Sequence, residues 1–261
     1  DDSYIIKGPS VAVVEGFRSG TDQEISEVPS LTLADNIETL WLRGAAAVNG
    51  TGNAMDNLII GNSNNDQLLG LDGNDTLQAG GGSDTLDGGT GINTADFSQL
   101  NASVNADLST GRTITQGLAG AGVLLNVQNL RGSERDDRLA GDAATNSLVG
   151  GTGNDTLVGS GGNNTLDGGN GFDLVDYSAA PSAVDINLAA RVVSQNGFGG
   201  SDSLVDVEGA IGSAFADSIE SVLTDGGTLA GGAGDDTYWI MSSGVAVVEN
   251  PGGGNDKEIS Y

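Results

Sequence analysis

The sequence contains no cysteine and no histidine among its 261 residues. Without cysteine, the chain can form neither disulfide bonds nor thiolate metal sites. Without histidine, a Ser-His-Asp triad, a Cys-His dyad and an imidazole zinc site are all excluded. These absences remove the commonest nucleophilic and zinc-dependent chemistries, and we expect that the chain is not an enzyme.

Basic and aromatic residues are also scarce. The chain has 9 Lys and Arg against 36 Asp and Glu, a formal net charge of -27, and 4% aromatic residues. Such a chain repels itself until cations neutralise it, and nucleic acid and anionic membranes are poor partners for it. Composition of this kind often gives disorder. However, 37% of the residues are hydrophobic and regularly spaced, which favours a folded structure.

Long apolar runs are missing as well. No stretch approaches the roughly 20 residues needed to span a bilayer, so no membrane insertion is expected. The sequence begins with Asp1 and shows no cleavable signal at its front. We therefore expect a piece of a larger protein.

Glycine is abundant, with 44 residues, and much of it recurs at every ninth position. GLDGNDTLQ from Gly70 and GGTGNDTLV from Gly150 are typical nonapeptides. Five consecutive nonapeptides start at Gly52, five more at Gly132, and a degenerate set at Gly212, so that the three arrays start at equal intervals. Internal repetition of this kind is the signature of a solenoid.

The repeats predict six segments and a longer period. The segments are a β flanking segment (1–51), a first nonapeptide array (52–96), a β spacer (97–131), a second array (132–176), a second β spacer (177–211) and a third, degenerate array leading into the next unit (212–261). Residues 1–27 are a copy of residues 235–261, with 14 identical positions at an offset of 234. We expect one turn of a tandem array.

The spacers alternate apolar and polar residues, which is typical of half-buried strands. In the first spacer Val104, Ala106 and Leu108 point one way, Ser109–Gly111 marks a turn, and Ile114 resumes the apolar alternation. We expect the spacers to widen or decorate the solenoid.

The nonapeptide combines residue types that suit a hard cation. Glycine at its first, second and fourth positions permits positive φ and lets carbonyl oxygens turn toward an ion. Asp at its sixth position adds an anionic oxygen, and the last three residues form a short strand with one apolar side chain inward. Stacked strands are about 4.7–4.9 Å apart. An ion midway between them fits the ~2.3–2.6 Å ligand distances of calcium better than the ~2.0–2.1 Å of magnesium.

A coil made of two nonapeptides places every second repeat on the same edge. In the second array Asp137, Asp155 and Asp173 then stack on one edge, and Asn146 and Asn164 stack on the other. An asparagine pair supplies oxygen but no charge. The asparagine edge is therefore predicted to carry a neutral amide ladder rather than a tight ion.

The same alternation between edges assigns the sixth-position residues of the first array. Asp66 stacks on Asp84, whereas Asp75 lies between Asn57 and Asn93. We expect the Asp66 and Asp84 pair to be the better site.

These repeats resemble the repeats-in-toxin (RTX) family, whose nonapeptide approximates G-G-x-G-x-D-x-U-x. The resemblance covers nearly the whole chain and implies an all-β fold, a parallel β-roll or β-helix solenoid. It also implies type I secretion and folding in extracellular calcium, outside the cell or on the surface of a bacterium. The residues predicted to supply calcium ligands are Asp66, Asp75, Asp84, Asp137, Asp155, Asp173, Gly73, Gly82, Gly151, Gly153 and Asp236.

Three functions compete. The favoured one is a calcium-binding scaffold of a large secreted or surface protein such as an adhesin, with neighbouring repeat units of the same or an adjacent chain as partners. The second is a calcium-dependent folding and secretion module attached to an extracellular enzyme. The third is a glycan-binding surface, for which Trp41 and Trp239 are candidates, although packing within the solenoid is the stronger interpretation of both.

Overall fold

The protein is all-β in the part of the chain that the computed structural model describes. That part comprises residues 1–8, 13–16, 20–44, 46–115, 121–222, 226–241, 243–249 and 252–260. Within these ranges no helix is long and apolar enough to cross a membrane. The chain divides into two compact units, Asp1–Ser133 and Glu134–Tyr261.

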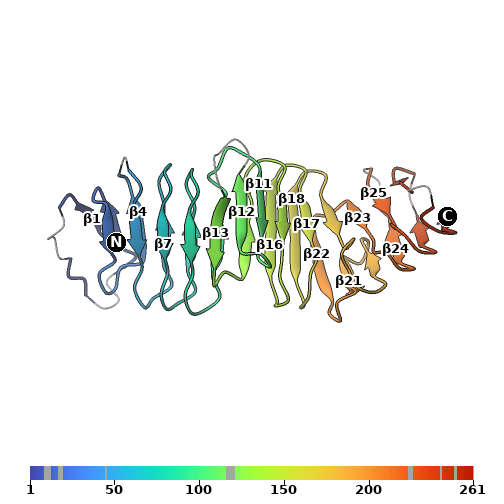
Figure 1. Ribbon diagram of the computed structural model, residues 1–261, viewed down its shortest axis with the longest axis horizontal. Helices are drawn as coiled ribbons and strands as arrows, with labels where there is room; N and C mark the ends of the chain where they lie inside the picture. Colours follow the sequence, from blue (N-terminus) through green and yellow to red (C-terminus); the bar gives the residue numbers. More distant parts are fainter. Residues whose placement is uncertain are drawn as a thin grey trace. The chain divides into compact units, whose positions relative to one another are not determined.

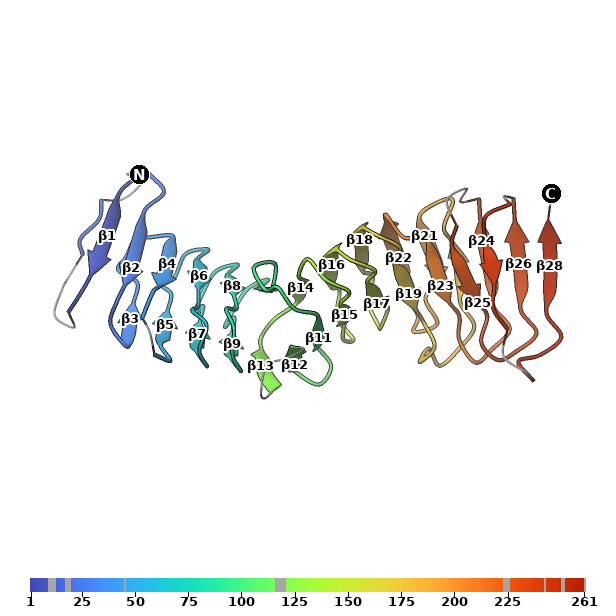
Figure 2. The same ribbon diagram turned by 90° about the horizontal axis from the view of Figure 1, so that it is seen from above.

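The N-terminal unit is a solenoid whose coils pass alternately through two sheets (Figures 1 and 2). Its first sheet has the order β1 (Ser3–Ile6), β2 (Gln23–Ser26), β4 (Thr39–Leu42), β6 (Leu58–Ile60), β8 (Thr76–Gln78), β10 (Thr94–Asp96) and β14 (Asn129–Arg131). Its second sheet has the order β3 (Ser30–Thr32), β5 (Asn49–Thr51), β7 (Gln67–Leu69), β9 (Thr85–Asp87), β13 (Ala121–Leu125), β12 (Arg112–Thr115) and β11 (Val104–Asp107).

The C-terminal unit is built in the same way. One sheet has the order β16 (Ser147–Thr152), β18 (Thr165–Asn170), β22 (Asp202–Val205), β21 (Val192–Gln195), β20 (Asp185–Asn187), β24 (Ser218–Ser221), β26 (Thr237–Ile240) and β28 (Lys257–Ser260). The other has the order β15 (Arg138–Ala140), β17 (Thr156–Val158), β19 (Leu174–Asp176), β23 (Gly209–Ile211), β25 (Thr228–Ala230) and β27 (Ala246–Val247). The predicted fold class, a parallel β-solenoid, is confirmed.

Within the arrays each coil consists of two nonapeptides, and the register follows from this repeat. Leu68 pairs with Leu86, and Leu148 pairs with Leu166, both in parallel strands. These four eighth-position side chains point inward and are at most 1% exposed, whereas the residues immediately before and after each of them are half-buried or exposed. Burying a leucine stabilises the fold by about 1.5–3 kcal/mol. One apolar residue per half-coil therefore forms a continuous core.

The spacers insert antiparallel strands into the walls. In the first spacer β11 pairs with β12, β12 pairs with β13, and β13 returns to a parallel pairing with β9. The pairing sets Ile114 opposite Asn105, on the outer face, so Ile114 is 57% exposed. The alternation expected to resume at Ile114 does resume after the turn, but its inward positions are occupied by Thr113 and Thr115, which are buried.

The two sequence copies form the same strands, each within its own unit. β1 pairs in parallel with β2 through Tyr4 and Glu24, and β26 pairs in parallel with β28 through Tyr238 and Glu258. The step along the chain from one partner to the next is the same in both pairs, and it is slightly longer than the step within the arrays. The six-segment division of the chain stays a prediction.

Candidate metal centres

Every sixth-position aspartate that the sequence singles out lies in the turn before a strand and is buried. The exposed fraction is 6% or less for each of Asp66, Asp75, Asp84, Asp137, Asp155, Asp173 and Asp236. Buried carboxylates are costly unless they are paired or coordinate a metal. The partners of these side chains therefore decide what the turns can bind.

Oδ1 accepts a backbone hydrogen bond from the neighbouring coil in Asp66, Asp75, Asp84, Asp155, Asp173 and Asp236. Oδ1 of Asp155 accepts a hydrogen bond from the Asp137 backbone N–H (2.8 Å), and Oδ1 of Asp173 accepts one from Asp155 (2.7 Å). In the first array Asp84 accepts from the Asp66 backbone in the same way (2.8 Å). The predicted stacks thus form columns in which a side chain of one coil accepts a hydrogen bond from the backbone of the preceding coil.

The second carboxylate oxygen, Oδ2, has no hydrogen-bond partner in several of these aspartates. Oδ2 of Asp75, Asp155, Asp173 and Asp236 is buried without any hydrogen-bond partner. Leaving a buried polar atom unsatisfied costs ~1–3 kcal/mol, and more for a charged group. A hard cation that prefers oxygen ligands, such as calcium, would remove this cost. The free oxygens therefore fit the ion that the sequence predicts.

Burial also shifts how these groups titrate. Burial, together with the nearby carboxylates of Asp137 and Asp173, raises the pKa of Asp155 to about 7. The pKa of Asp84 is raised to about 7 for the same reason, with Asp66 as the nearby charge. Burial likewise raises the pKa of Asp75, Asp173 and Asp236 to about 6. Without a cation, neutral forms of these side chains are thus populated near neutral pH.

The glycines bring carbonyl oxygens of adjacent coils close to the turns. Gly73, Gly82 and Gly153 at the fourth position have φ of 117°, 112° and 137°, a region that L side chains rarely adopt. A Cβ on Gly153 would lie 2.6 Å from the Arg135 carbonyl oxygen of the preceding coil. Gly151 has φ 117°, and its own carbonyl oxygen faces Gly169 of the next coil. Carbonyl oxygens are therefore available beside the aspartate columns.

The first-position glycine has a separate role that the sequence analysis did not identify. At Gly70, Gly150 and Gly231 an added Cβ would overlap Oδ2 of the sixth-position aspartate in the same repeat. The missing side chain therefore makes room for the oxygen that has no partner.

The asparagine edge of the second array differs in this respect. Oδ1 of Asn164 accepts from the Asn146 backbone N–H (2.9 Å), and Oδ1 of Asp202 accepts from the Asn164 backbone (2.8 Å). Oδ2 of Asp202 accepts the buried Tyr177 hydroxyl (2.6 Å). This column is an amide ladder that ends on a hydrogen-bonded carboxylate.

In the first array the sequence favoured the Asp66 and Asp84 pair as the better cation site, whereas the hydrogen bonds favour Asp75 over Asp66. Both oxygens of Asp66 accept backbone hydrogen bonds, Oδ1 from Val48 (3.0 Å) and Oδ2 from Asn62 (2.6 Å). Asp75, between Asn57 and Asn93, keeps an unpartnered Oδ2. Asp75 therefore has the stronger structural mark of a cation ligand.

Spacer residues that complete the columns were also missed by the sequence analysis. Gln128 accepts from the Asn93 backbone N–H (2.8 Å), and Glu208 accepts from Asp173 (2.9 Å). The two residues occupy equivalent places in the two spacers, at the same interval that separates the array starts. That shared interval was the available signal.

A second ladder runs along the fifth position. Oδ1 of Asp136 accepts from the Asn154 backbone (2.8 Å), and Oδ1 of Asn154 accepts from Phe172 (3.0 Å). The last residue of this column needs only its backbone N–H, so phenylalanine is tolerated there. Recurring Asn and Asp at the fifth position were the signal for this ladder.

Comparison with known proteins identifies the repeats. The family model of the RTX calcium-binding nonapeptide repeat matches residues 51–95 and 140–175, with four copies. These ranges coincide closely with the two arrays that contain most of the aspartate columns. None of the curated proteins compared with the chain matches it significantly.

Proposed function

We propose that this chain, whose repeats match the RTX calcium-binding nonapeptide repeat over residues 51–95 and 140–175, is a scaffold segment of a larger bacterial protein, outside the cell or on its surface, which folds when calcium binds. The predicted ligands are the sixth-position aspartates, Asp66, Asp75, Asp84, Asp137, Asp155, Asp173 and Asp236. Carbonyl oxygens around Gly73, Gly82, Gly151 and Gly153 would complete the coordination.

One observation carries this proposal: four of the seven proposed aspartates have a buried oxygen without a partner, in a chain with a net charge of -27. In the absence of a cation these oxygens destabilise the folded coil, both by lost hydration and by mutual repulsion. Each bound calcium offsets two negative charges and replaces the lost hydration. Binding to the folded coil therefore stabilises it by linkage.

The scaffold role, rather than a module that serves an enzyme, is supported by the long-period repeat. Copies 1–27 and 235–261 share 14 identical positions and the same pair of parallel strands. Tandem units of a solenoid contact chiefly their neighbours. Neighbouring repeat units are accordingly the partners we propose, besides calcium.

The test is a calcium titration followed by circular dichroism, with the chain first treated with a chelator at pH 7.5. We expect a largely unfolded spectrum without calcium and a β-rich spectrum with it. The midpoint should lie near ~10⁻⁴–10⁻³ M, the range of extracellular calcium modules. A β-rich spectrum that excess chelator leaves unchanged would refute the proposal.

A pair of variants locates the effect. Asp155→Ala removes a carboxylate whose Oδ2 has no partner, whereas Asn164→Ala removes a neutral side chain at the equivalent place on the other edge. Asp155→Ala should raise the calcium midpoint, and Asn164→Ala should change it little. Equal shifts would mean that carbonyl oxygens, rather than the sixth-position side chains, set the affinity.

A further inference from the structure

Two groups of three carboxylates lie outside the segments that match the repeat family. One consists of Asp2, Glu15 and Asp22, and the other of Asp236, Glu249 and Asp256. The three members are spaced identically along the chain in both groups. All three residues are identical between the two copies, 1–27 and 235–261. The same group is thus formed once in each unit.

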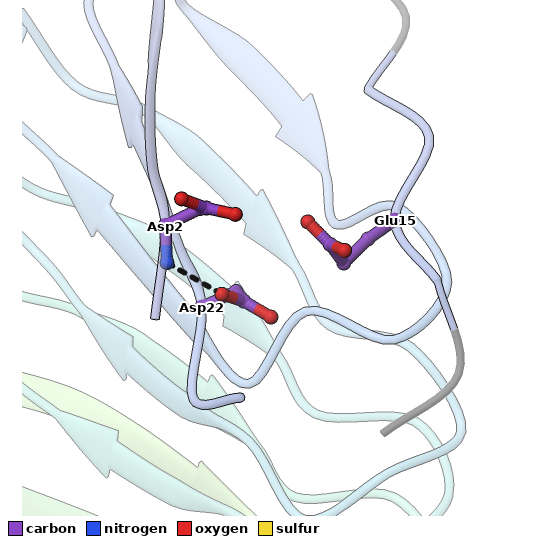
Figure 3. A group of neighbouring side chains, drawn as sticks. All are labelled: Asp2, Glu15 and Asp22. Carbon is purple, nitrogen blue, oxygen red and sulfur yellow. Dashed lines mark hydrogen bonds between the residues drawn. The ribbon is translucent and has the colours of Figure 1, made fainter. Parts of the chain in front are cut away.

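The backbone brings the three residues of a group together. Asp2 and Asp22 directly precede β1 and β2, which pair in parallel, and the Asp2 backbone N–H donates to Oδ1 of Asp22 (2.6 Å). Figure 3 shows the Asp2 and Asp22 side chains with the Glu15 carboxylate directed toward them. One carboxylate oxygen from each of the three lies within 4.8 Å of the other two.

The C-terminal group has the same construction. Asp236 and Asp256 directly precede β26 and β28, and the Asp236 backbone N–H donates to Oδ1 of Asp256 (3.0 Å). Glu249 follows β27, which belongs to the other sheet of the unit. Glu249 and Asp256 therefore lie in one connection between the two sheets of the unit.

Buried oxygens without partners point into both groups. Asp22 and Asp236 are each 1% exposed, and Oδ2 of each has no hydrogen-bond partner. Oε2 of Glu249 is buried without a partner as well.

A tyrosine fixes each glutamate. The Tyr4 hydroxyl donates to Glu15, and the equivalent Tyr238 hydroxyl donates to Glu249. In the first group the Gly16 backbone N–H also donates to Glu15 (2.8 Å). The glutamate is thus held in place before any ion arrives, which lowers the entropic cost of binding.

We propose that these two carboxylate triads are a second class of calcium site, in which a glutamate joins two aspartates that precede neighbouring parallel strands in the longer coils at the two ends of the chain. Three carboxylates give each triad up to three negative charges, all on hard oxygen ligands. Oxygens that share one calcium at ~2.3–2.6 Å lie within about 5.2 Å of one another, and the observed separations satisfy this limit. The triad of the N-terminal unit shares no residue with the proposed nonapeptide ligands, and the triad of the C-terminal unit shares only Asp236 with them.

The test counts calcium ions bound to the whole 261-residue chain by isothermal titration calorimetry. The double variant Glu15→Gln/Glu249→Gln should bind two ions fewer than the unaltered chain, and Glu249→Gln alone should bind one fewer. Glutamine can still accept the tyrosine hydrogen bond, so the coil should be retained. Glu258→Gln, an exposed residue of β28 outside the triad, is the matched control and should bind the full number.

Asp256→Asn is a second probe in case the double variant does not fold, since Asp256 is exposed and its change is mild. It should also remove one ion. An unchanged number of ions and an unchanged midpoint in Glu249→Gln and Asp256→Asn would overturn the inference. Asp155→Ala separates this outcome from failure of the scaffold proposal, because it weakens a nonapeptide site and leaves both triads intact.

Discussion

Two edges of the C-terminal unit share one backbone design and differ in charge. On one edge Asp137, Asp155 and Asp173 are joined coil to coil through Oδ1, and on the other Asn146 and Asn164 are joined in the same way. Both columns continue into the second spacer, where each ends on a carboxylate. The hydrogen-bond ladder is therefore a property of the fold, and the charge is an addition to it.

The two columns differ in whether their carboxylate oxygens all have hydrogen-bond partners. Asp155 and Asp173 each keep a buried Oδ2 without a partner, whereas Asp202, which ends the asparagine column, receives the Tyr177 hydroxyl. One edge is complete without a ligand, and the other is not. The comparison indicates that asparagine maintains the coil and that aspartate makes the coil depend on a cation.

The largest expected effect comes from neutralising all the aspartate columns together by acid. The folded-state pKa values of about 6 to 7 exceed the unfolded value of 3.8 for Asp75, Asp84, Asp155, Asp173 and Asp236. The folded chain then binds more protons than the unfolded chain between these limits, so stability rises as pH falls from about 7 toward 4. With calcium removed, we expect circular dichroism to show β-structure at pH 5 and its loss at pH 8.

The calcium-loaded chain is the control, and it should keep its β-rich spectrum at pH 8. If the calcium-free spectrum is the same at pH 5 and pH 8, the buried aspartates are not what destabilises that state.

Exchanging aspartate and asparagine at single positions tests the difference between the two edges. Asp155→Asn keeps the Oδ1 acceptor for the Asp137 backbone N–H and removes the buried charge. The free energy of unfolding of the calcium-free chain should therefore increase by roughly 2–4 kcal/mol at pH 7.5. The calcium concentration at the folding midpoint should also rise, because a ligand charge is lost. Asn164→Asp should destabilise the calcium-free chain by a similar amount. Urea unfolding in chelator measures both. A stabilising Asn164→Asp would contradict the distinction between the edges.

A smaller effect is expected from the first-position glycines of the two edges. A Cβ at Gly150 would overlap Oδ2 of Asp155, whereas a Cβ at Gly141 would lie 2.6 Å from Oδ1 of Asn146. Each alanine variant should cost about 1–3 kcal/mol, because well-packed positions tolerate added atoms poorly. Only Gly150→Ala should also raise the calcium midpoint. A rise in Gly141→Ala would mean that the asparagine edge binds an ion too.

The smallest expected effect comes from backbone strain at a residue that is not a proposed calcium ligand. Leu71 occupies a second position with φ 82°, where Gly151 of the second array has φ 117°. A non-glycine residue in this region is strained by about 1–2 kcal/mol. Leu71→Gly should therefore stabilise the calcium-loaded chain by about 1 kcal/mol in urea unfolding, and Leu71→Ala, which keeps the strain, should not. Equal behaviour of the two variants would show that no strain is stored there.

Much of this arrangement was predictable from the sequence because it is periodic. A nonapeptide and a two-repeat coil fix which sixth-position residues stack, and the structure joins Asp137 to Asp155 and Asn146 to Asn164 accordingly. The inward eighth-position residues follow from the same period. Local spacing is sufficient wherever every coil repeats the last one.

What the sequence did not reveal depends on contacts that no short period encodes. Glu208 and Asp202 end the two columns of the second array from within a spacer, far along the chain from the backbone groups they accept from. Ile114 faces outward because an antiparallel pairing sets its register. Glu15 belongs to a triad only because the coil brings it toward Asp2 and Asp22.

The two ladders run in opposite senses, and this gives every coil two unlike faces. At the sixth position Asp137 donates its backbone N–H to the following coil, and at the fifth position Asp136 accepts from that same coil through its side chain. A coil turned over would set donor against donor at one position and acceptor against acceptor at the other. The stack is therefore a polar polymer of coils, and tandem units can extend it in only one orientation.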